Sequence, residues 1–154
     1  MNINVIQANL DDQKHAEAII EITNEYAKDI MGGGKPLSDE IQRKMIPGMK
    51  AFHGTLVFLA HSGDRFVGVA NCFMGYSTFF AKPLINIHDL AVLPEARGKG
   101  VGKQLIEAVT QKANELGCCK VTLEVLENNP ARRLYEKEGF EYGDPKFFFM
   151  TKYL

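Results

Sequence analysis

The residues with the clearest chemical potential lie in a short glycine-rich stretch, residues 97–102 (RGKGVG). Hydrophobic periodicity predicts that a strand ends shortly before this stretch, near Val92, and that a helix begins directly after it. The first four N–H groups of a helix have no partner within the helix, and the helix dipole adds about half a positive charge at that end. Glycines let the backbone come close to a bound phosphate. Because Arg97 and Lys99 add positive charge, the stretch predicts a site for a ligand with more than one phosphate, and a solvated glycine turn is the alternative.

Two familiar phosphate-binding loops do not match this stretch. A Walker loop, G-x-x-x-x-G-K-[ST], would need a glycine at Arg97 and a hydroxyl residue at Gln104. A dinucleotide-binding loop, G-x-G-x-x-G, opens directly from a strand, whereas these glycines are spaced G-x-G-x-G and follow a Pro-Glu-Ala-Arg linker. Glu124, on the next predicted strand, lies near the spacing of a ribose-binding acid. A small dinucleotide-binding domain therefore stays open as an alternative.

The spacing that fits is Arg97-x-x-Gly100-x-Gly102, which closely resembles the pyrophosphate-binding motif of the GNAT superfamily of acyl-CoA-dependent N-acetyltransferases. Upstream, Leu90-Ala91-Val92-x-Pro94 resembles the fourth strand of that family. Downstream, the residues that resemble its signature after the fifth strand are Asn128, Ala131, Leu134, Tyr135, Gly139 and Phe140. The resemblance covers the C-terminal half in detail and the remainder by element order.

The resemblance implies acetyl-CoA as the cofactor and the attack of an amine on its thioester as the reaction. The backbone groups of Leu90 and Val92 could pair with the amide-bearing arm of the cofactor as an added strand would. Asn128 would contact the same arm unless it only caps a helix, and Arg132 would reach the nucleotide end unless it is a solvated helix residue. The cofactor-binding residues that the resemblance implies are Leu90, Ala91, Val92, Arg97, Gly98, Lys99, Gly100, Val101, Gly102, Lys103, Asn128 and Arg132.

Tyr135 is the residue that could donate a proton to the departing thiolate. A phenol has a reference pKa near 10 against about 8.5 for a thiol, so it is protonated at neutral pH. The register of Tyr135 within the family signature favours this role over simple packing beneath the last strand.

A base is also needed, because an alkylamine with a pKa near 10.4 is mostly an ammonium ion at pH 7. His88 and Asp89 stand just ahead of Leu90. Adjacent residues on a strand point to opposite faces, so only one of them faces the acceptor unless the strand is bulged. The segment resembles the Glu-Asp run of spermidine/spermine-type acetyltransferases, but His88 stands where that acid would be.

The N-terminal half supplies elements that could position this site. We expect a short strand at residues 3–8, a helix whose inner face carries Ala16, Ile19 and Ala27, and a glycine loop at 32–34. A second helix begins near Ser38 and is expected to break at Pro47-Gly48. The apolar runs 55–60 and 66–74 predict a hairpin, followed by an extended or looped segment that ends at Pro83.

The C-terminal half is expected to alternate strands and helices around the loop. The predicted order is a strand at 84–92, a helix with Leu105 and Val109 on its buried face, and a parallel strand at 121–125. A short helix beginning at Pro130 and a closing strand at 146–153 complete the chain.

Length and composition agree with a single enzyme-sized domain. The chain has 154 residues, is 45% hydrophobic and carries a net charge of −1, which argues against a polycationic nucleic-acid face. Three cysteines form neither a disulfide framework nor a zinc pattern, and no signal peptide or membrane span is visible. Cytoplasmic location, no metal and no membrane or nucleic-acid partner are the expectations.

We therefore expect one α/β (α+β) domain over residues 1–154 with a GNAT-like three-layer fold, a mixed sheet of about six to seven strands and about four flanking helices. The expected reaction is direct acetyl transfer from acetyl-CoA to a primary amine of a small molecule or peptide, with Tyr135, His88 and Asp89 as catalytic residues. A non-catalytic acyl-CoA-binding regulatory module of the same fold is the alternative. The sequence leaves open the acceptor and whether the chain forms a homodimer.

Overall fold

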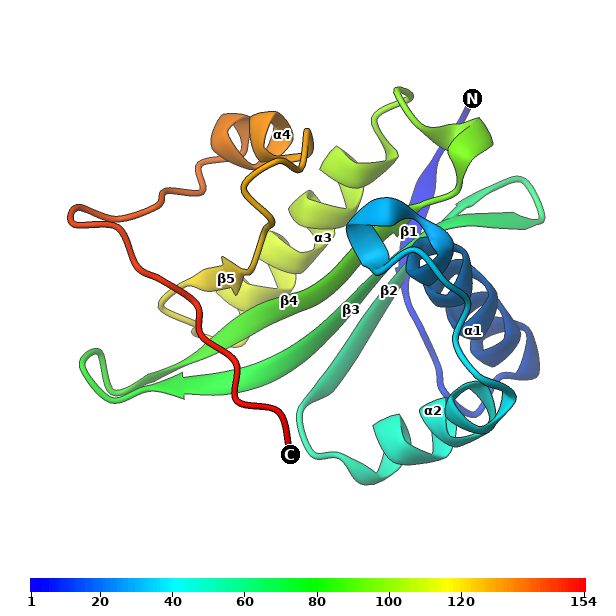
Figure 1. Cartoon of the computed structure of the whole chain (residues 1–154), viewed down its shortest axis with the longest axis horizontal. Coiled ribbons are helices and arrows are strands. Elements are labelled where there is room, and N and C mark those ends of the chain that lie inside the picture. The colour runs from blue at the N-terminus through cyan, green and yellow to red at the C-terminus, as the bar shows by residue number, and fades with distance from the viewer.

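The computed structural model describes all residues from 1 to 154 and places one mixed sheet between two layers of helices (Figure 1). The helices and strands are β1 (Asn4–Gln7), α1 (Gln13–Lys28), η1 (Ile30–Gly32), α2 (Asp39–Ala51), β2 (Thr55–Ser62), β3 (Arg65–Ser77), β4 (Lys82–Val92), η2 (Pro94–Ala96), α3 (Val101–Glu115), β5 (Val121–Leu123) and α4 (Arg132–Lys137). None of the helices is both long enough and apolar enough to cross a lipid bilayer.

The sheet follows chain order, β1-β2-β3-β4-β5. The first three pairings are antiparallel, and β5 is parallel to β4. The parallel pair was predicted, because α3 forms a helical crossover between the two strands. This connection brings the glycine stretch between β4 and α3 to the end of β4, beside the short strand β5.

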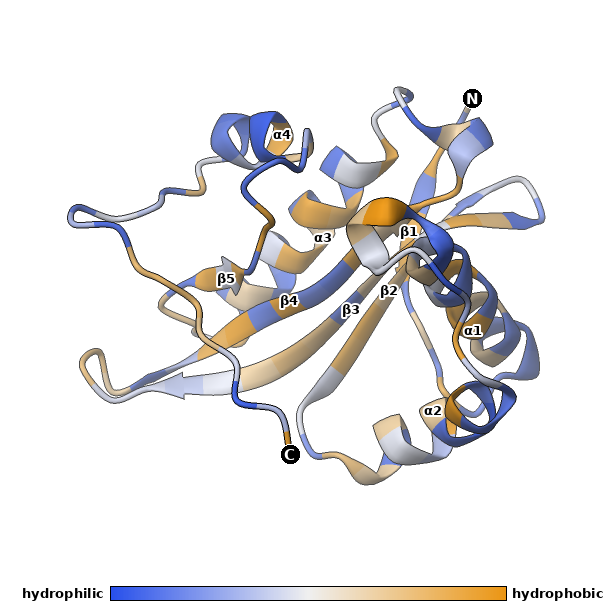
Figure 2. Cartoon of the chain, in the orientation of Figure 1, coloured by the Kyte–Doolittle hydropathy of each residue, from blue (hydrophilic) through white to orange (hydrophobic).

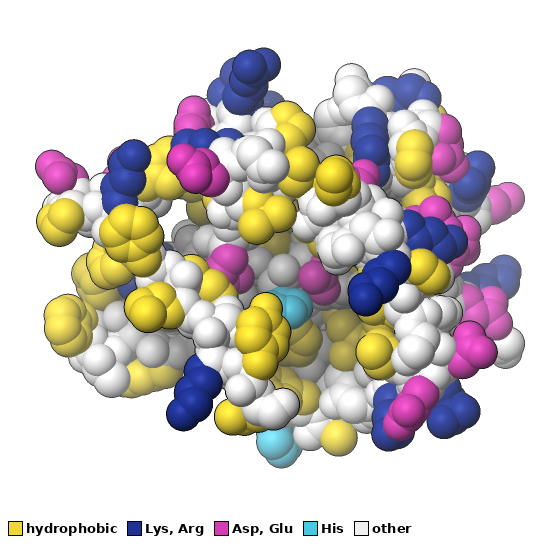
Figure 3. Space-filling view, viewed as in Figure 1, with side chains coloured by type: hydrophobic (Ala, Val, Ile, Leu, Met, Phe, Trp, Pro, Cys, Tyr) yellow, Lys and Arg dark blue, Asp and Glu magenta, His cyan; other side chains and the backbone are white.

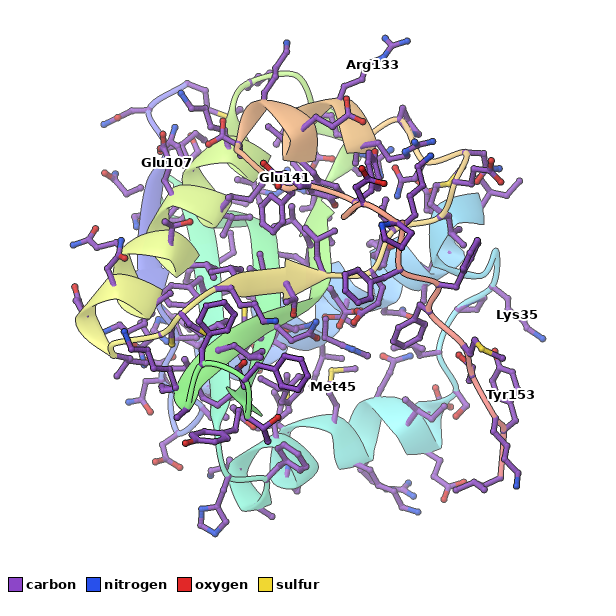
Figure 4. All side chains as sticks on the ribbon, turned by 90° about the vertical axis from the view of Figure 1, so that its left-hand side faces the viewer. Lys35, Met45, Glu107, Arg133, Glu141 and Tyr153 are labelled. Carbon is purple, nitrogen blue, oxygen red and sulfur yellow. The ribbon has the colours of Figure 1, made fainter.

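Two hydrophobic cores lie on opposite faces of the sheet. Along β2, Phe58 and Ala60 pack with α3, whereas Val57 and Leu59 pack with α1 and α2, as the two-residue period of a strand requires. Figure 4, turned by 90°, shows α3 on one side of the strands and α2 on the other. Hydrophobic residues accordingly follow the strands and the helix sides that face them (Figure 2).

Gly68 on β3 allows the start of α3 to sit close against the sheet. A β-carbon at this position would lie 2.8 Å from Cγ1 of Val101 and 3.1 Å from Cδ1 of Leu105. Val101 is itself buried as the first residue of α3. The packing of these three residues therefore fixes the position of the glycine stretch relative to the strands.

Several element boundaries differ from the sequence-based expectations. The predicted break at Pro47-Gly48 is wrong, because α2 continues through Pro47 to Ala51. Pro83 does not end an irregular segment, since it lies inside β4 opposite Tyr76 of β3. The C-terminal short helix begins two residues after Pro130, at Arg132.

The predicted closing strand at residues 146–153 is also wrong, and the sheet has five strands instead of six to seven. Residues 147–154, which we call the C-terminal arm, are all exposed and contain neither helix nor strand. The arm runs in front of the sheet, on the side of α1 and α2 (Figures 1 and 4). A strand forms only where another strand supplies hydrogen bonds, and the arm lies beside none.

Candidate active site

The start of α3 presents a run of unpartnered backbone donors. Gly98 and Gly100 have φ values of 74° and 81°, a left-handed conformation that glycine adopts without strain. Gly100 is the N-cap of α3 and provides no capping side chain. The six N–H groups from Gly98 to Lys103 make no hydrogen bond within the chain. This concentration of free donors at a helix start suits an anion with several oxygens.

The cations of this loop are partly engaged by other groups of the chain. The guanidinium of Arg97 donates from Nε to the Val92 carbonyl and from a terminal nitrogen to Asp29, both at 3.1 Å. Lys99 donates from Nζ to the Glu95 carbonyl at 2.7 Å. The pKa of Asp29 lies below its ordinary value, first because the Met31 N–H donates to it and second because Arg97 lies beside it. Arg97 therefore anchors the loop to the end of α1.

The sheet opens next to this loop. Pairing between β4 and β5 ends at Ile87 and Leu123, although β4 continues to Val92. Beyond His88, the edge of β4 that faces β5 has no strand beside it. The Val92 carbonyl lies on this edge and accepts the hydrogen bond from Nε of Arg97. The open edge and the unpartnered N–H groups of α3 are thus neighbouring parts of one surface.

A β-bulge sits at this opening. Asn71 on β3 lies opposite Asp89 and Cys72 lies opposite Ile87, so His88 is an extra residue without a partner. Ile87 and Leu90 both pack against the α3 core although they are three positions apart. His88 and Asp89 therefore both point to the α1–α2 face, and the bulged case, which the sequence left open, is the observed one.

Asp89 is held by a buried amide that sequence reasoning missed. Asn71 is 1% exposed, and its Nδ2 donates to Oδ2 of Asp89 and to Oγ1 of Thr23, both at 3.0 Å. The Oδ1 atom of Asn71 has no partner. The available signal was an asparagine within the apolar run 66–74, since a buried polar side chain requires hydrogen bonds to be tolerated.

His88 is exposed, and neither of its ring nitrogens is hydrogen-bonded within the chain. Its ring packs edge-on against Phe73 at 5.8 Å between centroids. Two positions earlier, Nδ2 of Asn86 donates to Glu124 at 3.1 Å. Figure 3 shows this face of the sheet as a hollow with acidic side chains and a histidine at its floor.

Tyr135 on α4 is partly buried. Burial, and to a lesser extent the nearby Tyr26, raises the pKa of Tyr135 to about 12. Its ring packs against Phe140 at 5.9 Å. The phenol consequently stays protonated throughout the physiological pH range and can donate a hydrogen bond.

Tyr26 on α1 was not identified from the sequence. Burial raises the pKa of Tyr26, and the carboxylates of Asp89 and Asp29 raise it further. Tyr26 therefore lies near enough to both Asp89 and Tyr135 to interact with them electrostatically. The sequence pattern around Tyr26 is that of an ordinary amphipathic helix, so it did not predict that Tyr26 lies near Asp89 and Tyr135.

The acetyltransferase (GNAT) family matches residues 17–140 of the chain, a span that contains the bulge, the glycine loop and Tyr135. The chain belongs to this family.

Relatives of this GNAT chain include the uncharacterized N-acetyltransferase YhfO of Bacillus subtilis, which is 29% identical over 146 residues, 90% of each chain. Thialysine N-epsilon-acetyltransferase of Bos taurus is 36% identical over 78 residues, 50% of this chain and 45% of the relative. Among solved structures, the aminoglycoside enzyme AAC(6')-Iy bound to a CoA bisubstrate analogue has a TM-score of 0.78 at 21% identity and covers 100% of both chains. That likeness confirms the GNAT fold.

Two polar residues near α4 complete the account of this GNAT site. Asn129, and not Asn128, caps the turn before α4 by accepting from the Ala131 N–H at 2.9 Å, so Asn128 stays exposed and free. Arg132 donates to the Tyr142 hydroxyl at 2.8 Å and to the Glu127 carbonyl. Asn128 and Arg132 both line a shallow polar depression. Asn128 is thus available to a ligand, whereas Arg132 is already engaged.

Proposed function

We propose that this GNAT-family chain transfers the acetyl group of acetyl-CoA directly to a primary amine of a small molecule or peptide. The observation that carries the proposal is the bulge at His88, which places His88 and Asp89 on one face at the point where β4 loses its β5 neighbour. Acetyl-CoA supplies the reactive thioester. The names of relatives support an amine acceptor, since they include acetyltransferases of thialysine and of a ribosomal-protein alanine.

The residues present fit acetyl-CoA. The unpartnered N–H groups from Gly98 to Lys103 would hold the pyrophosphate, because they combine several donors with the positive end of the α3 dipole. The backbone groups of Leu90 and the N–H of Val92 lie on the open edge of β4 and would pair with the amide-bearing arm as an additional strand does. Asn128 offers a further side-chain donor and acceptor near α4.

The amine acceptor would approach from the α1–α2 face. Asp89 attracts the ammonium form, and Asn71 keeps this carboxylate in a fixed orientation through its 3.0 Å hydrogen bond. His88 has free ring nitrogens and takes the proton that the ammonium must lose before attack. The two adjacent side chains would thus divide attraction and deprotonation between them.

Tyr135 would stabilise the negative charge that develops on sulfur. With a pKa of about 12, full proton transfer to a thiolate with a reference pKa near 8.5 is uphill by 3–4 pKa units, about 5 kcal/mol. The phenol would therefore act chiefly by donating a hydrogen bond to the leaving sulfur, and the proton would reach the thiolate from solvent.

A covalent cysteine intermediate has no support in this geometry. Cys72 is fully buried, and burial raises the pKa of its thiol to about 12. The negative charge of Asp89 is a second, smaller cause of the raised pKa. Cys118 and Cys119 precede β5, away from the bulge, and burial raises the pKa of Cys118 as well. Direct attack by the amine is the route that these positions favour.

An acetylation screen tests the proposal. The purified chain, in excess over acetyl-CoA, would be mixed with acetyl-CoA and a panel of alkylamines, amino acids and short peptides. The products would be identified by mass spectrometry. We expect at least one amine to gain an acetyl group at a rate above that without protein. Acetyl-CoA binding by calorimetry without transfer to any amine would instead indicate the non-catalytic acyl-CoA-binding module.

A further inference from the structure

Two carboxylates on the α1–α2 face of the sheet lie on either side of His88. Asp89 follows His88 directly, and the bulge turns both side chains to this face. Glu124 is the first residue after β5, and the register that ends at Ile87 and Leu123 places it at the level of the next β4 residue. Figure 3 shows an acidic side chain on each side of a histidine at the floor of the hollow. The proposed base therefore lies between two negative charges.

Each of these carboxylates is oriented by a neutral amide instead of a cation. Asn71 donates to Asp89 at 3.0 Å. Asn86 donates to Glu124 at 3.1 Å, and because Asn86 follows Ile85 of the α3 core, both side chains lie on the α1–α2 face. Neither carboxylate takes part in an ion pair of the chain. The amides thus fix the positions of the two charges and leave them uncompensated.

A buried acceptor atom beside Asp89 also lacks a donor. Oδ1 of Asn71 has no hydrogen-bond partner, although the Asn71 side chain is only 1% exposed. Buried polar atoms of folded proteins almost always have a partner. An alkylammonium group bound at Asp89 carries three N–H donors, and one of them could satisfy Oδ1 directly or through a water. This part of the site therefore suits a ligand with cationic donors.

Apolar surface lies next to these charges. The Phe73 ring packs edge-on against His88 at 5.8 Å and against Phe52 at 5.5 Å between centroids. Phe52 is 58% exposed, so part of this aromatic surface is open to a ligand. Figure 4 shows the Met45 side chain directed from α2 toward the strands. Methylene groups of a ligand that spans the two carboxylates would be buried against this surface.

We propose that the acceptor of the acetyl group is a diamine, a small molecule in which two alkylammonium groups are joined by an apolar chain. This inference rests on the proposed acetyl transfer. The reacting amine lies at His88 and Asp89, and the second ammonium lies at Glu124, where it pairs with a carboxylate that has no cation in the chain. Both ends of such a molecule are charged at pH 7, because alkylamines have a pKa near 10.4.

Three acceptors that differ only at the far end test the second ammonium. Putrescine, pentylamine and δ-aminovalerate share an aminobutyl group and end in an ammonium, a methyl and a carboxylate. We expect kcat/KM per amino group to fall in that order, with putrescine above pentylamine by about fivefold to tenfold, the effect of a partly exposed charged hydrogen bond. Equal values for putrescine and pentylamine would overturn the diamine inference and leave acetyl transfer itself intact.

Substitutions at position 124 assign this preference to its carboxylate. Glu124→Gln keeps an acceptor oxygen for Asn86, and the ratio of putrescine to pentylamine should fall toward one. Glu21→Gln removes the same charge from an exposed position of α1 and should keep the wild-type ratio. Glu124→Lys should prefer δ-aminovalerate to putrescine, because the charge at the far end is then attracted or repelled in the opposite sense. Circular dichroism would check the folds, and an unchanged ratio in Glu124→Gln is enough to overturn the assignment.

Binding without chemistry separates this inference from the acetyl-transfer proposal. Putrescine and pentylamine would be titrated by calorimetry into the chain saturated with CoA. We expect the wild type to bind putrescine about fivefold more tightly or better, and Glu124→Gln to lose this difference. Such binding by a chain that acetylates no amine would support the diamine site and contradict the transfer. Putrescine bound no more tightly than pentylamine would contradict the diamine site, whether or not the chain transfers acetyl groups.

Discussion

Asp89 owes its position to residues far away in the sequence. The Asn71 amide bonds to both Asp89 and Thr23, so α1, β3 and β4 meet at one buried side chain. His88 reaches the same face only because it has no partner on β3. Neither relation could be predicted from residue types, since both depend on how β3 and β4 are paired. The sequence did predict Tyr135, His88 and Asp89 as catalytic residues, and these roles stay predictions.

Replacing Tyr135 by Phe separates the role of its hydroxyl from that of its ring. The packing against Phe140 is retained, so acetyl-CoA affinity should change little. We expect the rate of acetyl transfer in single-turnover mixing to fall on the order of 10²- to 10³-fold, because the hydrogen bond to the leaving sulfur is lost. A variant that transfers acetyl at the wild-type rate would show that Tyr135 is only a packing residue.

His88→Gln tests the proposed base. Glutamine keeps a polar side chain of similar length but cannot take up a proton, so kcat/KM should fall on the order of 10²-fold. Asp89→Asn is the matched comparison, because it keeps the size of the side chain beside Asn71 and removes the charge. A normal rate in His88→Gln together with a large loss in Asp89→Asn would assign the proton transfer to Asp89.

At the scale of elements, α3 combines the features that make an anion site. Its N-cap is a glycine, its first residues have unpartnered N–H groups, and Gly68 lets it pack closely on β3. The glycine loop and the helix after it were predicted from the sequence, because glycine spacing and apolar period are local signals. The course of α2 was not, since the packing of Ile46 and Met49 in the core outweighs the local preference of Pro47 to end a helix.

Gly100→Asp should weaken acetyl-CoA binding. A negative charge at the N-cap of α3 opposes the pyrophosphate by about 1–2 kcal/mol, roughly five- to thirtyfold in Kd by calorimetry. Gly100→Asn is the control, because it has the same shape, tolerates a φ of 81° comparably and carries no charge. Equal affinities in the two variants would show that charge at this position does not face the ligand.

Pro47→Ala should stabilise the chain. Pro47 is exposed within α2, and alanine would restore an N–H that can donate to the Arg43 carbonyl. Because proline also restricts the unfolded chain, we expect a net gain of about 2 kcal/mol in the free energy of unfolding by urea. Gly48→Ala, with open space around its β-carbon, should add about 1 kcal/mol by itself. Loss of stability in Pro47→Ala would mean that the proline shapes a bend needed for packing.

At the scale of the molecule, two layers of helices on one sheet are connected by few polar contacts. The Arg97–Asp29 ion pair is one of them, and it joins the end of α1 to the loop that begins α3. The arrangement of layers was predicted, because it follows from alternating strands and amphipathic helices. The absence of a closing strand at residues 146–153 was not predicted. The composition of a segment shows that it can form a strand, but it does not show whether a neighbouring strand is available to pair with it.

The Asp29 carboxylate should make stability depend on acidity. Its pKa is lowered on folding, so its contribution is complete above the unfolded value near 3.9 and is lost as the pH falls through the lower folded value. Asp29→Asn should therefore be less stable than wild type at pH 6, and the difference should shrink toward pH 2–3 in urea unfolding. Asp64→Asn, at a carboxylate outside every ion pair, serves as the control and should follow the wild-type curve. A constant difference at all pH values would contradict this account.

The bulge also means that the chain carries one residue that neither core requires. Ile87 and Leu90 face α3 and Asp89 faces α1, so removal of His88 would leave every interior residue on its present side and restore regular alternation. At a regular position of a strand, deletion of one residue moves every later side chain of that strand to the opposite face of the sheet. Deletion of His88 thus shortens β4 without moving any interior side chain to the other face of the sheet. The shortened chain should fold as stably as the original while losing its activity.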